Sequence, residues 1–161
     1  MPPDAIRDDG PPAAPEDWAA DWLLASWAKV IERLDADYPD FGLGVTLNVG
    51  GAIYSGVMVS GRRWVDDMVT VLRTKSIDQR IGSALAESFE EEKQRYQRPE
   101  FVNGPVRFLH LLHASLVDTR GERTGEGLSM RFRLDAVAAW AIAGWAVGST
   151  NWTSPEPGFT H

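Results

Sequence analysis

The chain carries LGVTLNVGGAIYSGVMVS at residues 43–60, and this stretch decides the fold that we expect. Apolar residues at positions 43, 45, 47 and 49 alternate with small or polar ones, which is the period-two pattern of a half-buried strand. Gly50 and Gly51 then supply the positive φ angles of a two-residue hairpin turn. Gly56 lies in the middle of the returning strand, where a glycine marks a bend or a close backbone approach. The stretch therefore predicts a bent antiparallel hairpin.

Helical patterns flank this hairpin on both sides. Upstream, an amphipathic helix is predicted by an apolar stripe of Leu23, Trp27, Val30, Ile31 and Leu34. Downstream, the pattern indicates two helices joined near residues 74–76. Their apolar positions are Trp64, Val65, Met68, Val71 and Leu72 in the first helix and Ile77, Ile81, Leu85 and Phe89 in the second.

The last third of the chain returns to strands. Residues 106–118 form a long apolar run that we expect to be central, residues 128–135 alternate in polarity, and a brief turn leads to a final strand around residues 140–145. This order predicts one α+β domain over residues 17–148. We expect a small, strongly bent antiparallel sheet or an Sm/SH3-like barrel, with an N-terminal amphipathic helix and a two-helix insertion after the second strand.

The two ends of the chain have a different character. Residues 1–16 hold five prolines, so we expect a disordered arm there. Residues 149–161 are expected to form a flexible tail.

Inside the domain, the sheet is expected to close around a core of strand residues, namely Val45, Leu47, Val57, Val59, Phe108, Leu112, Phe132 and Ile142.

Composition excludes several classes of function. The chain has no cysteine, which removes disulfides and thiolate chemistry and suits a reducing compartment, so we expect a cytoplasmic protein. No apolar run reaches the roughly 18 residues that span a bilayer. The net charge of −7 argues against a dedicated nucleic-acid binder, because such a surface repels a phosphate backbone.

We also find no pattern that predicts an enzyme, a metal centre or a cofactor. His110 and His113 are three residues apart on a predicted strand, so their side chains should point to opposite faces and cannot chelate one metal together. His161 belongs to the tail. No serine lies in a nucleophile elbow, and the glycines of the hairpin do not match a phosphate-binding loop.

Three segments together resemble the gas vesicle accessory protein U family. They are the hairpin with the start of the next helix at residues 43–65, the strand segment FLHL at residues 108–111, and RFRLDAVAAW at residues 131–140. Their order and spacing also agree with that family. The resemblance covers roughly residues 17–148. It implies an accessory protein without catalytic activity that contacts gas vesicle shell proteins or other accessory proteins during vesicle assembly or clustering, and that associates with the vesicle in the cytoplasm.

The tryptophan content suggests how such contacts are made. Seven tryptophans is a high count for this length, and tryptophan is enriched at binding hot spots. Trp18 and Trp22 fall off the main stripe of the first helix, and Trp152 lies in the tail. These three are the candidate interface residues, including for self-association, with packing on the chain's own sheet as the alternative for the first two. An Sm-like barrel that binds RNA, or another oligomeric interaction module, is the alternative function.

Overall fold

The computed structural model describes residues 21–146. The expected arm, the tail, Trp18 and Trp152 lie outside these residues and stay predictions. The elements follow the predicted order with two short additions, α4 and the 3₁₀ turn η2. In chain order they are α1 (Trp22–Leu34), β1 (Gly42–Val49), β2 (Ala52–Val59), α2 (Gly61–Lys75), α3 (Gln79–Tyr96), α4 (Pro99–Asn103), β3 (Phe108–Val117), β4 (Arg123–Arg133), η2 (Leu134–Ala136) and β5 (Val137–Ala146).

The sheet has five antiparallel strands in the order β4-β3-β2-β1-β5. Its centre is the predicted hairpin of β1 and β2. Gly50 and Gly51 have φ angles of 61° and 85°, as the turn requires, and the side chain of Asn48 accepts a hydrogen bond of 3.2 Å from the Gly51 amide. The long apolar run became β3, which lies between β2 and β4.

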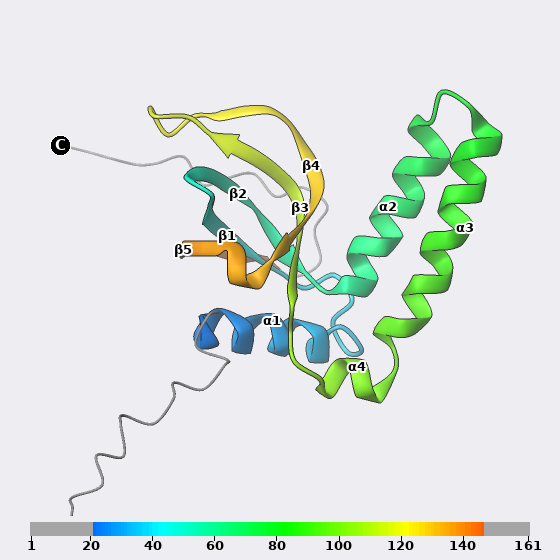
Figure 1. The fold of residues 1–161 in the computed structure, drawn as a ribbon, viewed down its shortest axis with the longest axis horizontal. Coiled ribbons are helices and arrows are strands. Elements are labelled where there is room, and N and C mark those ends of the chain that lie inside the picture. Colours follow the sequence, from blue (N-terminus) through cyan, green and yellow to red (C-terminus); the bar gives the residue numbers. More distant parts are fainter. Residues whose placement is uncertain (1–20, 147–161) are drawn as a thin grey trace, which may run out of the picture.

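The sheet is bent but not closed (Figure 1). Strands β4 and β5 are joined by η2, yet they pair with β3 and β1 at opposite edges and share no ladder with each other in residues 21–146. The fold is therefore α+β with an open antiparallel sheet, the first of the two expected forms. The ladders of β1 with β5, β2 with β3 and β3 with β4 contain register shifts, which mark β-bulges or similar irregularities of the kind that bend strands.

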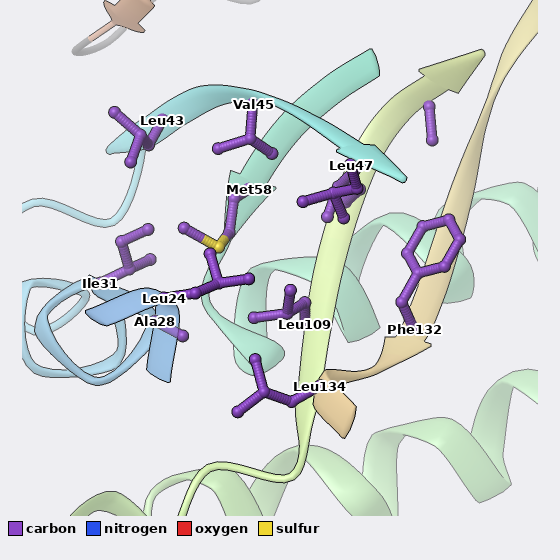
Figure 2. Packing of buried hydrophobic residues seen from close by; sticks show 12 residues of the cluster. Leu24, Ala28, Ile31, Leu43, Val45, Leu47, Met58, Leu109, Phe132 and Leu134 are labelled. Carbon is purple, nitrogen blue, oxygen red and sulfur yellow. The ribbon is translucent and has the colours of Figure 1, made fainter. Parts of the chain in front are cut away.

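Helices cover both faces of this sheet, so there are two hydrophobic cores. On one face, α1 packs over β1, β2 and β3, and Figure 2 shows Leu24, Ala28 and Ile31 of α1 approaching the strand side chains. On the other face, α2 and α3 pack as an antiparallel pair against β2 and β3 (Figure 1). The fold is a three-layer arrangement of helix, sheet and helix pair.

This arrangement corrects the expected single core. Val45, Leu47 and Phe132 are buried under α1, whereas Val57, Val59 and Leu112 are buried under α2 and α3. The register explains the split. Val45 pairs with Gly56 and Leu47 with Tyr54, and paired residues share a face, so Val57 and Val59 point the other way.

Two further expected core residues differ from the prediction. Ile142 is 47% exposed, because β5 is an edge strand and the half-buried Trp140, not Ile142, packs on the α1 core. Phe108 is only half-buried, at the first position of β3, with the guanidinium carbon of Arg131 lying 3.7 Å from its ring centroid.

Helix α1 is rotated relative to the prediction. Leu23, Trp27 and Val30 of the expected stripe are exposed, whereas Ile31 is buried as predicted. The buried face is formed by Leu24, Ala28 and Ile31. Polar anchors at both ends account for this rotation. Asp21 accepts a 2.7 Å hydrogen bond from the indole nitrogen of Trp140, and Asp35 accepts one of 2.6 Å from the Ser60 hydroxyl.

Helix α3 is turned in a similar way. Gly82 and Ala86 face α2, and a Cβ added to Gly82 would lie 2.5 Å from the Leu72 carbonyl oxygen, so the two helices approach closely. This small-residue contact directs Ile81 and Leu85 outward, although their spacing predicted a packing stripe, and Ile77 lies exposed in the bend before the helix. Phe89, the last member of that stripe, does pack against the core.

We expect matched substitutions to separate the two faces of α1. Leu24→Ala should lower the free energy of unfolding by about 2–5 kcal/mol, because Leu24 is fully buried. Leu23→Ala should cost roughly 0.5 kcal/mol or less, because that side chain is 40% exposed. Urea denaturation of both variants measures the difference. A larger loss in Leu23→Ala than in Leu24→Ala would show that α1 presents the stripe that the sequence pattern predicts.

We expect Gly56→Ala to destabilise the domain by about 1 kcal/mol or more. A Cβ at this position would lie 3.0 Å from both the Ala114 Cα and the Leu112 carbonyl oxygen, so β3 would have to shift. Gly121→Ala serves as a control for backbone strain without crowding. Gly121 has a φ of 82°, which disfavours alanine, but a Cβ added there would contact no other atom. Thermal melting of Gly56→Ala at the wild-type temperature would refute the close approach of β2 to β3.

Candidate functional site

The outer face of α1 is an exposed apolar surface. We use "outer α1 face" for Trp22, Leu23, Trp27 and Val30, which lie within an arc of about 140° at ~100° per residue. Trp22 is 75% exposed, and the other three are each exposed by more than a third. Large side chains gathered on one side of a helix without cover mark an interaction surface more often than isolated exposed residues do.

The start of α1 is held firmly, which fixes this face in space. Asp21 caps the helix, and one of its carboxylate oxygens accepts hydrogen bonds from the amides of Leu23 and Leu24 at 2.9 and 3.0 Å. Its other oxygen accepts the bond from Trp140 on β5. This bond is the main reason that the pKa of Asp21 lies below its usual value. Trp22 is therefore presented to solvent next to a rigid cap.

A second exposed apolar stripe runs along α3. Ile81 and Leu85 lie one turn apart on α3, and Ile77 is fully exposed in the bend that precedes the helix. We call it the α3 stripe. It is aliphatic, whereas the outer α1 face contains two tryptophans.

A buried polar cluster lies between the two helical layers, and it is formed by Glu32 of α1, Tyr96 of α3 and His110 of β3. His110 is 4% exposed, and its Nε2 lies 3.1 Å from the Tyr96 hydroxyl. Its Nδ1 is 3.9 Å from Glu32 Oε1, which is too long for a hydrogen bond. That same oxygen accepts a 2.7 Å bond from the Gly61 amide.

Burial shifts the acid–base properties of all three groups. Desolvation raises the pKa of Glu32 from 4.5 to about 7, and the nearby Asp35 charge adds to this rise. Desolvation lowers the pKa of His110 from 6.5 to about 3, assisted by the positive charge of Arg131. Burial also raises the pKa of Tyr96. At neutral pH His110 is thus uncharged and Glu32 is partly protonated.

A cavity of about 310 Å³ opens beside this cluster. Glu32 and His110 contribute polar groups, Arg107 and Arg131 contribute cations, and α4 with the following loop contributes apolar walls. The remaining lining residues are Glu100, Phe101, Val102, Gly104, Pro105, Val106 and Phe108. Its volume falls at the lower end of the range for small-molecule sites.

The structure describes some of the residues that the sequence analysis singled out, and others lie outside it. Trp22 lies on the outer α1 face, whereas Trp18 and Trp152 fall outside the described residues. His110 is buried and His113 is exposed at a bulge with a φ of 52°. The cluster of Glu32, Tyr96 and His110 was missed, since its members are far apart in the chain. In the part of the chain that the structure describes, no three acidic or histidine side chains are placed to hold a metal ion.

We expect Glu32→Gln to change how stability depends on pH. A raised carboxyl pKa contributes stability that is present below pH 4.5 and lost as the pH rises to about 7. Glutamine keeps an oxygen to accept the Gly61 amide bond but carries no charge. Relative to wild type, the variant should therefore gain stability between these pH values, by up to roughly 3 kcal/mol.

Urea denaturation at several pH values measures this difference. The His110 contribution has the opposite sign, since a lowered histidine pKa contributes stability above pH 6.5 that is lost as the pH falls toward 3. It is common to both proteins and cancels in the comparison. Parallel pH profiles for wild type and Glu32→Gln would show that Glu32 is solvated.

Comparisons with known proteins show to which family the chain belongs. Among residues 21–146, no helix combines the length and apolar character that crossing a bilayer requires. No curated protein and no solved structure matches the chain. A family model described as Gas vesicle protein GvpU-like matches residues 21–145, which is most of the chain, and it confirms the resemblance found in the hairpin and the later segments. The chain therefore belongs to the gas vesicle protein GvpU-like family.

Proposed function

We propose that the protein is a non-enzymatic gas vesicle accessory protein that acts through protein–protein contacts in vesicle assembly or clustering. Family membership supports the accessory role. The observation that carries the contact mechanism is the outer α1 face, where Trp22 and Trp27 are exposed on a helix whose other side is fixed to the sheet.

This face has the composition of a binding surface. Tryptophan side chains at interfaces often contribute most of the binding energy, because they bury a large apolar area with few rotatable bonds. At ~100° per residue, Arg33 and Ser26 lie between Trp22 and the other three residues of this face, and Lys29 lies just beyond Trp22.

The proposed partner is a protein component of the gas vesicle, either the shell or another accessory protein, in the cytoplasm. Each vesicle presents many copies of its shell protein, so weak contacts can act together through avidity. Self-association of the chain, through the outer α1 face or through Trp18 and Trp152, would then join neighbouring vesicles. This mechanism needs neither a cofactor nor a catalytic group.

The fold relationship to small Sm-like or SH3-like barrels also stays a proposal. It is supported by the strand order, in which β4 and β5 are consecutive in the chain but occupy opposite edges of a bent sheet. RNA binding, the alternative function of such barrels, is not favoured by any observation on the described residues, and the net charge of −7 opposes it.

We expect the double variant Trp22→Ser, Trp27→Ser to lose binding to purified gas vesicles. A hot-spot tryptophan contributes about 2 kcal/mol or more, so the affinity should fall by roughly 30-fold even if only one of the two side chains is a hot spot. Co-sedimentation with vesicles and light scattering of vesicle suspensions measure binding and clustering. Trp22 is 75% exposed but Trp27 only 38%, so thermal melting must show that the double variant stays folded at the temperature of the binding assay.

The matched control is Ile77→Ser, Ile81→Ser, which removes exposed apolar area from the α3 stripe instead. It should bind vesicles as the wild type does. Multi-angle light scattering of all three proteins reports self-association separately. Unchanged vesicle binding by the tryptophan variant, or an equal loss in the isoleucine variant, would refute a specific role for the outer α1 face.

A further inference from the structure

The cavity beside Glu32 and His110 goes beyond the proposed function and does not depend on it. It forms where four parts of the fold meet, namely α1, α4 with the following loop, β3 and β4. At about 310 Å³ it can hold a molecule larger than a single water. Its walls are mostly apolar, whereas its polar groups are few and converge from different elements.

Arg131 is the distinctive group of this cavity. Its guanidinium lies over the Phe108 ring, with 3.7 Å between the guanidinium carbon and the ring centroid. It has no carboxylate within ion-pair distance among the described residues, although Arg133 on the same strand pairs with Asp135 and Arg62 pairs with Asp35. A guanidinium stacked on a ring presents its planar N–H fork at the edge, which matches the geometry of a carboxylate.

The polar floor of the cavity is also incomplete. His110 Nδ1 and Glu32 Oε1 are 3.9 Å apart without a direct bond, and both residues line the cavity. His110 uses its other ring nitrogen on Tyr96. Glu32 Oε1 already accepts the Gly61 amide, so His110 Nδ1 is the atom of this pair that is placed to hydrogen-bond a ligand or solvent atom beside them.

We propose that this cavity binds a small organic carboxylate with an apolar body. The carboxylate group would be held by the guanidinium of Arg131 and by the polar floor of Glu32 and His110. The apolar body would lie along Phe108, Phe101 and Val106. Arg107 adds a second cation to the lining, and Glu100 is the carboxylate on the α4 side.

The protonation of Glu32 should couple this binding to pH. The groups that face Glu32 are Asp35 on its own helix, Arg62 at the start of α2, Tyr96 on α3, His110 on β3, Arg131 on β4 and Glu100 on α4. Protonated Glu32 can donate a hydrogen bond to a carboxylate, whereas ionised Glu32 repels it. Because burial raises the pKa of Glu32 to about 7, affinity should be highest below that pH and fall above it.

Benzoate and hexanoate serve as probes, and their amides, benzamide and hexanamide, are the uncharged controls. Each probe is titrated into the ¹⁵N-labelled full-length chain at about pH 6, and amide shifts are followed by NMR. We expect saturable shifts around Phe108, His110 and Arg131 with at least one acid, and weaker binding of its amide by about tenfold.

Variants then test the roles of single residues. Arg131→Gln should weaken binding by about tenfold or more, and Arg131→Lys, which keeps the charge but loses the fork, should lie in between. Arg133→Gln is the matched control on the same strand and should bind as the wild type. Between about pH 6 and pH 8.5, wild-type affinity should fall by about tenfold or more, whereas Glu32→Gln should be nearly unaffected.

Three results would overturn the proposal. One is the absence of saturable shifts with either acid, which would show a cavity filled by water only. Another is equal binding of acids and amides. The third is wild-type affinity in Arg131→Gln. Because vesicle binding is not measured in these titrations, their failure leaves the proposed contact function standing, and the reverse also holds.

Discussion

The rotation of α1 about its own axis is the constraint on which the rest of the structure depends. Three acidic side chains on its inner side set it: Asp21 accepts a hydrogen bond from Trp140 on β5, whereas Glu32 and Asp35 accept hydrogen bonds from Gly61 and Ser60 at the start of α2. Ser60 also caps α2, since its hydroxyl accepts the Arg63 amide at 3.1 Å. The bonds of Glu32 and Asp35 therefore also fix where α2 begins relative to α1. A hydrogen bond to a charged group is worth about 1.5–3 kcal/mol, and this value applies best to the part-buried Asp35, because solvent weakens the bond of the exposed Asp21.

This rotation produces both candidate sites. With Leu24, Ala28 and Ile31 turned toward the sheet, the two tryptophans of α1 are left on the outside, and Glu32 is brought under α2 to face His110. Ala28 makes the choice sterically favourable, because a small residue at the centre of the contact lets the helix approach the strands closely. A rotation of one residue would bury Trp27 and expose Leu24. It would also break all three acidic anchors, so the two arrangements do not interconvert easily.

Local patterns made much of this fold predictable. The Gly50–Gly51 turn, the strand glycine at 56 and the order of the main elements follow from period and turn chemistry, which are encoded within a few residues. The α1 rotation and the α3 orientation were not predictable this way, because each helix carries two overlapping apolar stripes and the choice depends on partners distant in sequence. The cluster at His110 was hidden for the same reason. Its members come from three elements, and the bulge at His113 changes the alternation of β3 just beyond it.

The Glu32 carboxyl is difficult to explain as a purely structural residue. A buried carboxyl with a raised pKa lowers the stability of the folded state at neutral pH, because its charged form has lost its hydration. Glutamine would accept the same bond from the Gly61 amide without that loss. Leucine at position 32 would remove the polar group that faces His110 across the cavity. The chain thus keeps an ionisable group where a neutral one would satisfy the fold. Ionisable residues that line a cavity and lower the stability of the fold are typical of functional sites, because the side chain that function requires there is not the one that is best for stability.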